Sequence, residues 1–326
     1  RGAAPSREEA RCGAGSRRTG CGSRPLPDAS QLGVRAGYAP GAGTGRVDVR
    51  GIARRETSRA RLETTALVSG LEVVRYHGLG NETAAPREDA YYRVNQATVA
   101  VLPEVVLPVG RPELALGVAV RYADTRETPG RIVTDAPPYG AGNFGQAGLR
   151  AELRYDGRDV PGRPTRGARF IAGGAWYPAV WDVDSAFGEA HAELATYLTA
   201  AGVPLRPTLA LRAGGRHVWG HYPFHEAAYL GDGRTVRLGR QNRYGGDAAV
   251  WSNAELRLRL GSFFVLLPGD IGVFGIGDLG RVFLEGESST VWHGAAGGGL
   301  WMSLIRPDNV FSIAAVTSAE RTGVYF

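Results

Sequence analysis

The chain has 326 residues, 48 of which are glycine, and it carries a formal net charge of +6. Glycine destabilises a helix interior by about 1 kcal/mol relative to alanine, so this composition disfavours a mostly helical protein. The basic residues are all arginine apart from six histidines, and they are interleaved with aspartate and glutamate. Because no basic tract alternates with stacking aromatic residues, nucleic-acid binding is not expected.

The first 28 residues are rich in arginine, glycine, alanine and serine and show no periodicity. We expect residues 1–28 to form a disordered or irregular segment. This segment holds the only two cysteines, Cys12 and Cys21, whose spacing fits neither a redox motif nor a zinc site. The chain starts without a secretory signal, so an exported protein would have lost its signal or would be the C-terminal part of a longer protein.

From Gln31 onward, apolar and polar residues alternate with period two, which predicts β-strands. In the windows 147–156, 205–216 and 250–260, one face is apolar and the other is charged; Leu149 and Leu153, for example, oppose Arg150 and Arg154. Further strand-like ranges are 44–55, 60–76, 91–106, 111–125, 167–177, 185–199, 271–285, 290–305, 309–318 and 320–326.

These ranges hold ten or so residues each, whereas a soluble strand has about five or six and a tilted membrane strand needs about 9–11. No stretch reaches the roughly 18 apolar residues of a membrane helix. We therefore expect an all-β fold: residues 29–326 forming one large antiparallel transmembrane β-barrel. Its strand number should be about 16, since bacterial single-chain barrels have even numbers.

Two further observations bear on the membrane. A one-residue register slip over 205–216 would turn Arg206, Arg212 and Arg216 toward lipid, at a cost on the order of 10 kcal/mol. Aromatic residues lie near many expected strand ends, as in membrane girdles, although ordinary strand propensity explains them equally well. They are Tyr91, Tyr92, Tyr122, Trp176, Tyr177, Trp181, Tyr197, Trp219 and Tyr222. Alternation alone also fits a large soluble barrel or sandwich whose apolar face points inward.

Several short motifs, in order, resemble the barrel domain of the BamA/TamA superfamily of bacterial surface antigens. The run 155–159 followed by 164–167 is similar to a family strand-turn-strand signature, D-x-R-[DN] and then P-T-x-G. Its matching positions are Asp156, Arg158, Pro164 and Gly167. The region from Val236 to Arg257 resembles the family's long loop, which folds into the barrel lumen, and the strand after it. Its matching positions are Arg243, Gly246, Asp247, Glu255 and Arg257.

The family's loop carries V-R-G-[FY], and here the run is Val236-Arg237-Leu238-Gly239. Arg237 matches, whereas the glycine and the aromatic do not. Residues 277–280 resemble the family's F-x-D-x-G strand motif, with Asp278 and Gly280 matching and Ile276 replacing the aromatic. The resemblance implies that Arg237 meets Asp278 in the lumen, where a guanidinium and a carboxylate form strong bidentate hydrogen bonds. Such a pair would hold the loop inside the barrel.

Other candidate chemistry is weak. His217, His221 and His225 have a spacing that could bind zinc on a helix, but Gly220 and Pro223 would break one. The G-x-G-x-x-G run at 140–145 lacks the strand before it and the helix after it that a dinucleotide site requires. We find no catalytic constellation, and we expect neither enzymatic activity nor a cofactor nor a metal.

The resemblance implies a monomeric bacterial outer-membrane protein, surrounded by outer-membrane lipid, that assembles or inserts other barrel proteins or translocates polypeptides. Two alternatives remain open. The barrel could anchor or export a fused N-terminal domain, because residues 76–83 resemble a loop of family members fused to a phosphoesterase. It could also be a diffusion pore, which lumenal arginines would make anion-selective.

Overall fold

The computed structural model describes residues 28–39, 43–55, 58–306 and 308–326, and the segment expected at residues 1–28 lies outside them except for Asp28. The described strands are β1 (Asp28–Ala39), β2 (Thr44–Arg55), β3 (Arg61–Ser69), β4 (Gln96–Pro108), β5 (Glu113–Thr125), β6 (Asn143–Asp156), β7 (Gly167–Tyr177), β8 (Phe187–Thr199), β9 (Thr208–Gly220), β10 (Ala228–Leu230), β11 (Tyr244–Gly246), β12 (Ala248–Phe264), β13 (Pro268–Phe283), β14 (His293–Leu304), β15 (Val310–Ser318) and β16 (Thr322–Tyr325). Two short helices, α1 (Ile132–Asp135) and η1 (Phe224–Glu226), lie in connections. Among the helices of these ranges, none is long and apolar enough to cross a membrane.

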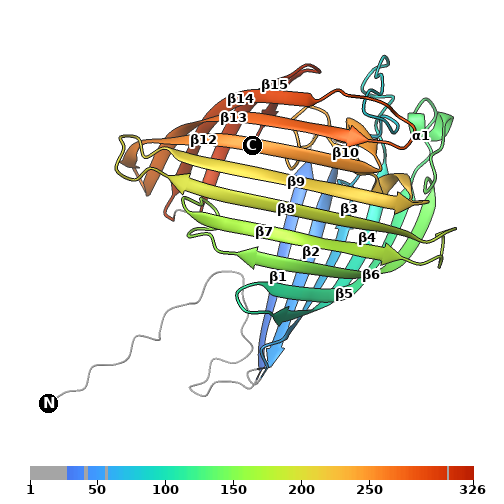
Figure 1. Cartoon of the computed structure of the whole chain (residues 1–326), viewed down its shortest axis with the longest axis horizontal. Helices are drawn as coiled ribbons and strands as arrows, with labels where there is room; N and C mark the ends of the chain where they lie inside the picture. Colours follow the sequence, from blue (N-terminus) through green and yellow to red (C-terminus); the bar gives the residue numbers. More distant parts are fainter. Residues whose placement is uncertain (1–27, 40–42, 56–57, 307) are drawn as a thin grey trace.

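Fourteen of these strands form one antiparallel sheet, in which each strand pairs with the next along the chain (Figure 1). The other two, β10 and β11, form a separate ribbon between β9 and β12. The sixteen described strands equal the expected number, but two of them are not strands of the sheet. The connection between β9 and β12 was expected to be a long loop folded into the lumen, and the ribbon within it was not predicted.

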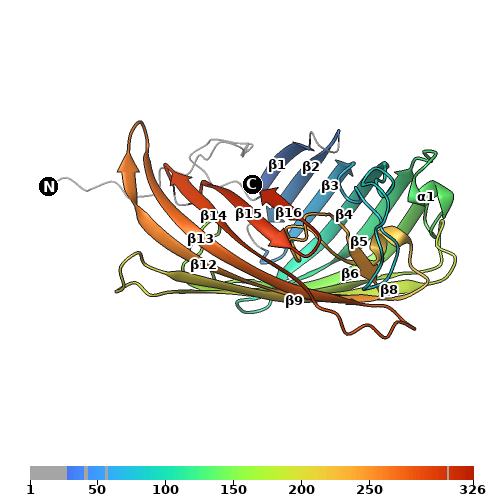
Figure 2. The ribbon, with the colours of Figure 1, turned by 90° about the horizontal axis from the view of Figure 1, so that it is seen from above.

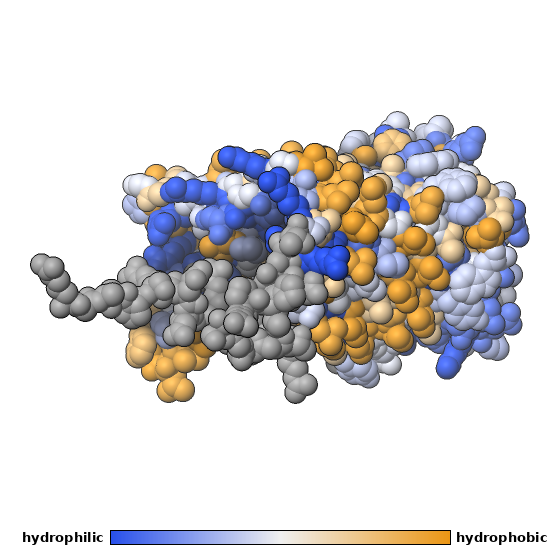
Figure 3. All heavy atoms as spheres, turned by 90° about the horizontal axis from the view of Figure 1, so that it is seen from below, coloured by the Kyte–Doolittle hydropathy of each residue, from blue (hydrophilic) through white to orange (hydrophobic). Residues whose placement is uncertain are grey.

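The sheet curls around a concave face, and part of the connection between β9 and β12 lies against this face (Figure 2). Side chains on its convex face are apolar and exposed: Leu116 is 45% exposed, Leu149 60% and Leu300 53%. Side chains on the concave face include buried carboxylates such as Glu63 and Asp278. In the space-filling view, hydrophobic residues cover much of the outer surface, and hydrophilic residues surround a hollow beside it (Figure 3). This arrangement is the reverse of a soluble sandwich and is typical of a barrel that faces lipid.

The two ends of the sheet differ in their connections. The connections 70–95, 126–142, 178–186, 221–247 and 284–292 lie at one end, and the mostly shorter connections 109–112, 157–166, 200–207 and 265–267 lie at the other. Outer-membrane barrels place long loops outside the cell and short turns in the periplasm. Exposed aromatic residues mark the long-loop end of the convex face: Tyr122, Trp176, Trp181, Trp219 and Trp292. By contrast, the expected girdle residues Tyr92 and Tyr177 are buried.

The edges of the sheet, β1 and β16, share no ladder within the described residues. The β16 strand pairs only with Ala314–Thr317 of β15, so the stretch of β15 from Val310 to Ile313 has no partner on that side. Within the described residues no ladder closes the sheet, which curls around its concave face, and the closed barrel stays a prediction. Edge pairing joins residues far apart in the chain, and a local alternation pattern carries no information about it.

Several strand boundaries also differ from the expectation. The ranges 44–55 and 167–177 match β2 and β7. The range 60–76 was too long, because β3 ends at Ser69 and Val73 and Tyr76 are buried in a loop cluster with Val94 and Phe224. Their apolar character reflects packing between connections and not a strand face. In the window 205–216, Leu205 and Arg206 lie in a turn with positive φ, so Arg206 does not fix the register.

Candidate functional site: a segment held on the concave face

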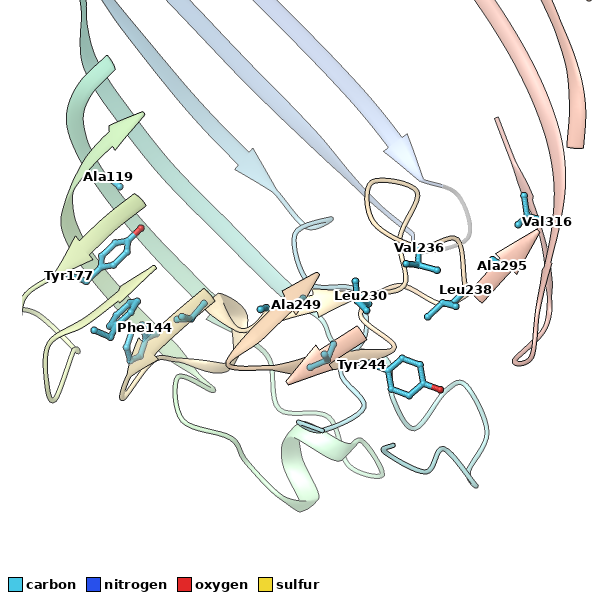
Figure 4. Packing of buried hydrophobic residues seen from close by; sticks show 14 of the residues in the cluster. Ala119, Phe144, Tyr177, Leu230, Val236, Leu238, Tyr244, Ala249, Ala295 and Val316 are labelled. Carbon is cyan, nitrogen blue, oxygen red and sulfur yellow. The ribbon is translucent and has the colours of Figure 1, made fainter. Parts of the chain in front are cut away.

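Residues 221–247, named here the inner segment, connect β9 to β12 and pack against the concave face of the sheet. Three of its side chains, Leu230, Val236 and Leu238, are buried with residues of β12, β13 and β15 such as Ile276 and Val316 (Figure 4). The ribbon of β10 and β11 gives this segment its own backbone hydrogen bonds. Apolar packing thus fixes part of the inner segment to the concave face.

The structure brings Arg237 and Asp278 together. Nη1 of Arg237 donates to both carboxylate oxygens of Asp278, at 2.8 and 2.9 Å, and its backbone N–H donates to Oδ2 at 3.1 Å. Nδ2 of Asn253 donates to Oδ1 of Asp278 at 2.8 Å and to the carbonyl of Thr235 at 2.7 Å. The Asp278 side chain is fully buried, and these donors replace the water it has lost.

The absence of a side chain at Gly280 lets residues 231–240, named here the tip of the inner segment, approach the sheet. A Cβ on Gly280 of β13 would lie 2.6 Å from Cγ2 of Val236 and 2.9 Å from the carbonyl oxygen of Val250. The tip then turns at Gly239, whose φ is +78° and whose N–H donates to the hydroxyl of Tyr325 in β16 at 2.9 Å. Leu238, which departs from the family pattern, is 1% exposed and fills the apolar cluster.

A second contact, which sequence reasoning missed, holds the first part of the inner segment. The carboxylate of Glu226 accepts hydrogen bonds of 2.7 Å from Arg121 of β5, Gln146 of β6 and Arg216 of β9. Burial raises the pKa of Glu226, but the two guanidinium groups outweigh it and lower the pKa to about 2. No local motif could have revealed this site, because its partners lie 105, 80 and 10 residues away.

The connection 70–95 lies against the inner segment. The N–H of Gly80 donates to the carbonyl of Gly245 at 2.7 Å, and Nη2 of Arg243 donates to the carbonyl of Thr83 at 2.8 Å. Arg243 also pairs with Glu320 at 3.0 Å. Two long connections and the C-terminal hairpin therefore form one packed unit.

Two buried residues of connection 70–95, Asn81 and His77, make polar contacts to other parts of the chain. Asn81 is 0% exposed; its Nδ2 donates to Oγ of Ser289 at 2.7 Å, and its Oδ1 accepts from the N–H of Val282 at 2.9 Å. His77 lies 3.1 Å from the carbonyl of Asn242 through Nδ1. Burial and the nearby guanidinium of Arg243 lower the pKa of His77 to about 4, so this histidine is neutral at pH 7.

The turn between β6 and β7 holds the first group of motif residues. Arg158 pairs with Asp156 through two bonds, of 2.6 and 2.8 Å. Asp159, a motif residue that was not among the candidate sites, accepts bonds from the backbone N–H groups of Val160 and Thr165, both at 2.9 Å. Burial raises the pKa of Asp159, but hydrogen bonds from the Thr165 hydroxyl and from these backbone N–H groups outweigh burial and lower the pKa to about 2.

The same turn also contacts strands β12 and β13. The carbonyl of Pro164 lies 3.5 Å from Nη1 of Arg257 in β12, and Nη2 of Arg163 pairs with Asp270 of β13 at 2.9 Å. Gly167 has φ +96°, and a Cβ there would meet the carbonyl oxygen of Gly157 at 2.1 Å. The glycine of this motif is therefore a steric requirement of the turn.

The remaining motif residues have separate contacts. Asp247 accepts from the hydroxyl of Tyr222 at 2.5 Å and from the N–H of Glu285 at 2.7 Å. Gly246 pairs with Ala228 in the ribbon. Glu255 accepts from Nε of Arg257 at 2.5 Å on the concave face of β12. The motif positions thus form several local contacts and not a single cluster.

Ion pairs line the rest of the concave face. Arg61 binds Glu113 through bonds of 2.5 and 2.7 Å, and Arg154 binds Glu104 through bonds of 2.7 and 3.0 Å. They surround a cavity of about 1160 Å³. Three arginines that line this cavity have no side-chain partner among the described residues: Arg35, Arg111 and Arg234.

The three histidines spaced by four point to different places. The ring of His221 stacks on Tyr139, His225 packs edge-on against Phe144, and His217 lies beside Trp219. Burial lowers the pKa of His225 to about 4. In the described part of the chain, no group of three histidine, cysteine or acidic residues is arranged to hold a metal ion.

The fold is similar to that of BamA from Haemophilus ducreyi lacking POTRA domains 1-3, with a TM-score of 0.57. The match has 12% sequence identity and covers 92% of this chain and 68% of that chain. No protein-family model and no curated protein matches the sequence. The similarity establishes an all-β fold like that of the BamA barrel.

Proposed function

We propose that this chain, which has the fold of the BamA barrel, is an outer-membrane protein of the BamA/TamA superfamily that assembles other barrel proteins or translocates polypeptides. The observation that carries the proposal is a pair of sheet edges, β1 and β16, that share no ladder within the described residues, beside an inner segment that contacts the last hairpin. The unpaired side of β15, from Val310 to Ile313, and the edge strand β1 offer backbone groups to an incoming strand. The pair Arg237–Asp278 would hold the inner segment in place while the edge strands pair with the incoming strand.

The inner segment supports this reading because it links the wall to the last hairpin. One side of its tip binds Asp278 in β13, and the other contacts Tyr325 and Glu320 in the C-terminal hairpin. A displacement of the edge strand β16 would therefore also displace the tip and alter the Arg237–Asp278 contact. The resemblance to the superfamily is the reason for proposing a barrel protein or polypeptide as the client. The contacts support a coupling between the last hairpin and the inner segment.

The test is an insertion assay in liposomes. Unfolded outer-membrane barrel protein should fold faster into liposomes that contain this chain than into empty ones, as measured by heat-modifiable gel mobility. Tethering the edges through Val34→Cys and Val324→Cys with a bismaleimide, in a chain whose two native cysteines are serine, should abolish the acceleration. A tether between Val118 and Leu149, which already pair in β5 and β6, is the matched control. Equal folding rates with and without this chain would contradict the proposal.

A second candidate is an anion-selective pore, which the arginines of the 1160 Å³ cavity favour. The inner segment opposes it, because packed residues occupy part of the concave face. Large, steady anion currents in planar bilayers would support the pore, whereas closed or flickering behaviour would support the assembly role. The further alternative, an anchor for a fused N-terminal domain, stays a proposal that sequencing upstream of Arg1 would test.

A further inference from the structure

The long-loop end of the sheet holds a cavity to which the inner segment contributes no residue. The volume of this cavity is about 390 Å³, and it lies where β2 and β4 begin and β3 ends. Arg93 of connection 70–95 and Arg126, which follows β5, both line it. The described residues that line the cavity include neither aspartate nor glutamate.

Both arginines lack a counter-charge. Among the described residues, Arg93 and Arg126 form no ion pair and no side-chain hydrogen bond. Asp124, which lies opposite Ala97 of the cavity wall in the β4–β5 ladder, pairs with neither of them. Arg75 faces Arg93 in an isolated β-bridge, so the cross-strand neighbour of Arg93 is a third cation. The guanidinium groups therefore keep their positive charge and all their N–H donors for an anion.

Two polar side chains beside the arginines also have unused hydrogen-bonding groups. Thr44 and Asn95 line the cavity, and neither side chain has a hydrogen-bond partner within the ranges that the structure describes. The N–H of Arg126 donates to the carbonyl of Asn95 at 2.9 Å, which holds the two connections together at this point. A Cβ on Gly70 would collide with the hydroxyl oxygen of Thr44, so this glycine leaves room for the hydroxyl.

Apolar surface adjoins the cavity on the convex face. Val68, which lines the cavity, is 58% exposed, and its ladder partner Val99 on β4 is 46% exposed. The next strand continues this apolar strip with Tyr122, which pairs with Val99 and is 37% exposed. Tyrosine is enriched at the level of the lipid headgroups in membrane proteins. The cavity therefore lies at headgroup level, with the valines beside it available to acyl chains.

We propose that Arg93 and Arg126 bind the phosphate group of a lipid headgroup in the outer leaflet, with Thr44 and Asn95 as additional donors. The planar guanidinium group of arginine binds two phosphate oxygens at once, which favours phosphate over other anions. A free phosphate would satisfy the arginines but would leave the exposed valines uncovered. The inference goes beyond the proposed function, because it uses the lipid-facing convex face and no client protein.

Native mass spectrometry of the detergent-solubilised chain tests the site with phosphatidic acid, phosphatidylcholine and inorganic phosphate as probes. The parent chain should bind phosphatidic acid at lower concentration than phosphatidylcholine, whose phosphate is neutralised by its own cation. The double variant Arg93→Gln with Arg126→Gln should raise the phosphatidic acid concentration at half occupancy by about tenfold or more, because two charged hydrogen-bond donors are lost.

Arg111→Gln is the matched control, because Arg111 is also an unpaired arginine but lies in the β4–β5 turn at the opposite end of the sheet. Its half-occupancy concentration should equal that of the parent. Asp124→Asn removes a negative charge beside the cavity and should lower this concentration by about two- to fivefold. Such a gain in affinity cannot arise from misfolding.

Equal affinity for phosphatidic acid in the parent and in the double variant would overturn the site, and so would an unchanged affinity in Asp124→Asn. Displacement of the lipid by inorganic phosphate at equal concentration would overturn the lipid as the ligand and indicate a site for free phosphate. Failure of the proposed function shows separately, as unaccelerated folding of a barrel protein in liposomes that contain the parent chain.

Discussion

At the scale of single residues, buried carboxylates determine where the inner segment lies. Asp278 and Glu226 each accept at least three hydrogen bonds, and each binds arginine. Such pairs contribute little relative to an apolar core, but removing one partner leaves a desolvated charge. Specific placement of the segment, more than overall stability, is what these residues provide.

Reversing the charge at position 237 tests this placement. Arg237→Glu should destabilise the folded protein by about 3 kcal/mol, because two carboxylates would meet at a buried position. Adding Asp278→Arg should restore part of the loss. Both effects are measured as the urea concentration at which half of the protein has lost the gel mobility of the folded form. The absence of any rescue would show that the two side chains do not interact.

The buried histidines make stability depend on pH. His77 and His225 have native pKa values of about 4, against 6.5 for the unfolded chain. The unfolded chain therefore binds more protons between these values. The contribution of these two histidines to the free energy of unfolding should be constant above pH 6.5, fall as the pH drops toward 4, and level off below, by up to about 3 kcal/mol for each histidine. Urea midpoints at pH 7.5 and 5 should differ less in His77→Gln than in the parent; an identical difference would contradict the assignment.

At the scale of elements, the sequence predicts some strands closely and some connections poorly. The ranges of β2 and β7 follow from alternation, since a half-buried strand imposes period two. The connection 70–95 and the β10–β11 ribbon do not, because apolar residues of the connection pack against other connections and Leu230 of the ribbon packs against the sheet. Arg237 and Asp278 could be paired only through family resemblance, and Glu226 could not be found, because its partners come from three strands.

The contact between the inner segment and β13 depends on Gly280. Gly280→Ala should displace the tip and cost about 1–3 kcal/mol, as overpacking of a core does. Val236→Ala in the same chain should recover part of this cost, because it removes the Cγ2 atom 2.6 Å from the added Cβ. Limited proteolysis of the tip measures the displacement. A Gly280→Ala protein with parental protease resistance would argue against this contact.

The β6–β7 turn is organised by one acidic side chain. Asp159→Asn keeps the size but loses the charge that accepts several N–H groups, so the turn should become more mobile. We expect faster amide hydrogen exchange at residues 160–166 and unchanged exchange in β2. Exchange rates equal to those of the parent would mean that the backbone alone sets the turn.

At the scale of the whole molecule, the distribution of apolar residues is the reverse of a soluble protein. Exposed leucines cover the convex face, and ion pairs line the concave one. Alternation in the sequence could not say which face is outside, because a soluble barrel has the same pattern. Strand length and charge density favoured lipid, and the exposed apolar face agrees with them.

The most direct test of the membrane-barrel account is a spin-label scan of β6 in lipid bilayers. Labels at Leu149 and Ala151 on the convex face should collide mainly with oxygen, which dissolves in lipid. Labels at Arg150 and Glu152 on the concave face should collide mainly with a water-soluble nickel chelate. Alternation with period two in this sense is the predicted result. High nickel accessibility at Leu149 and Ala151 would contradict the account.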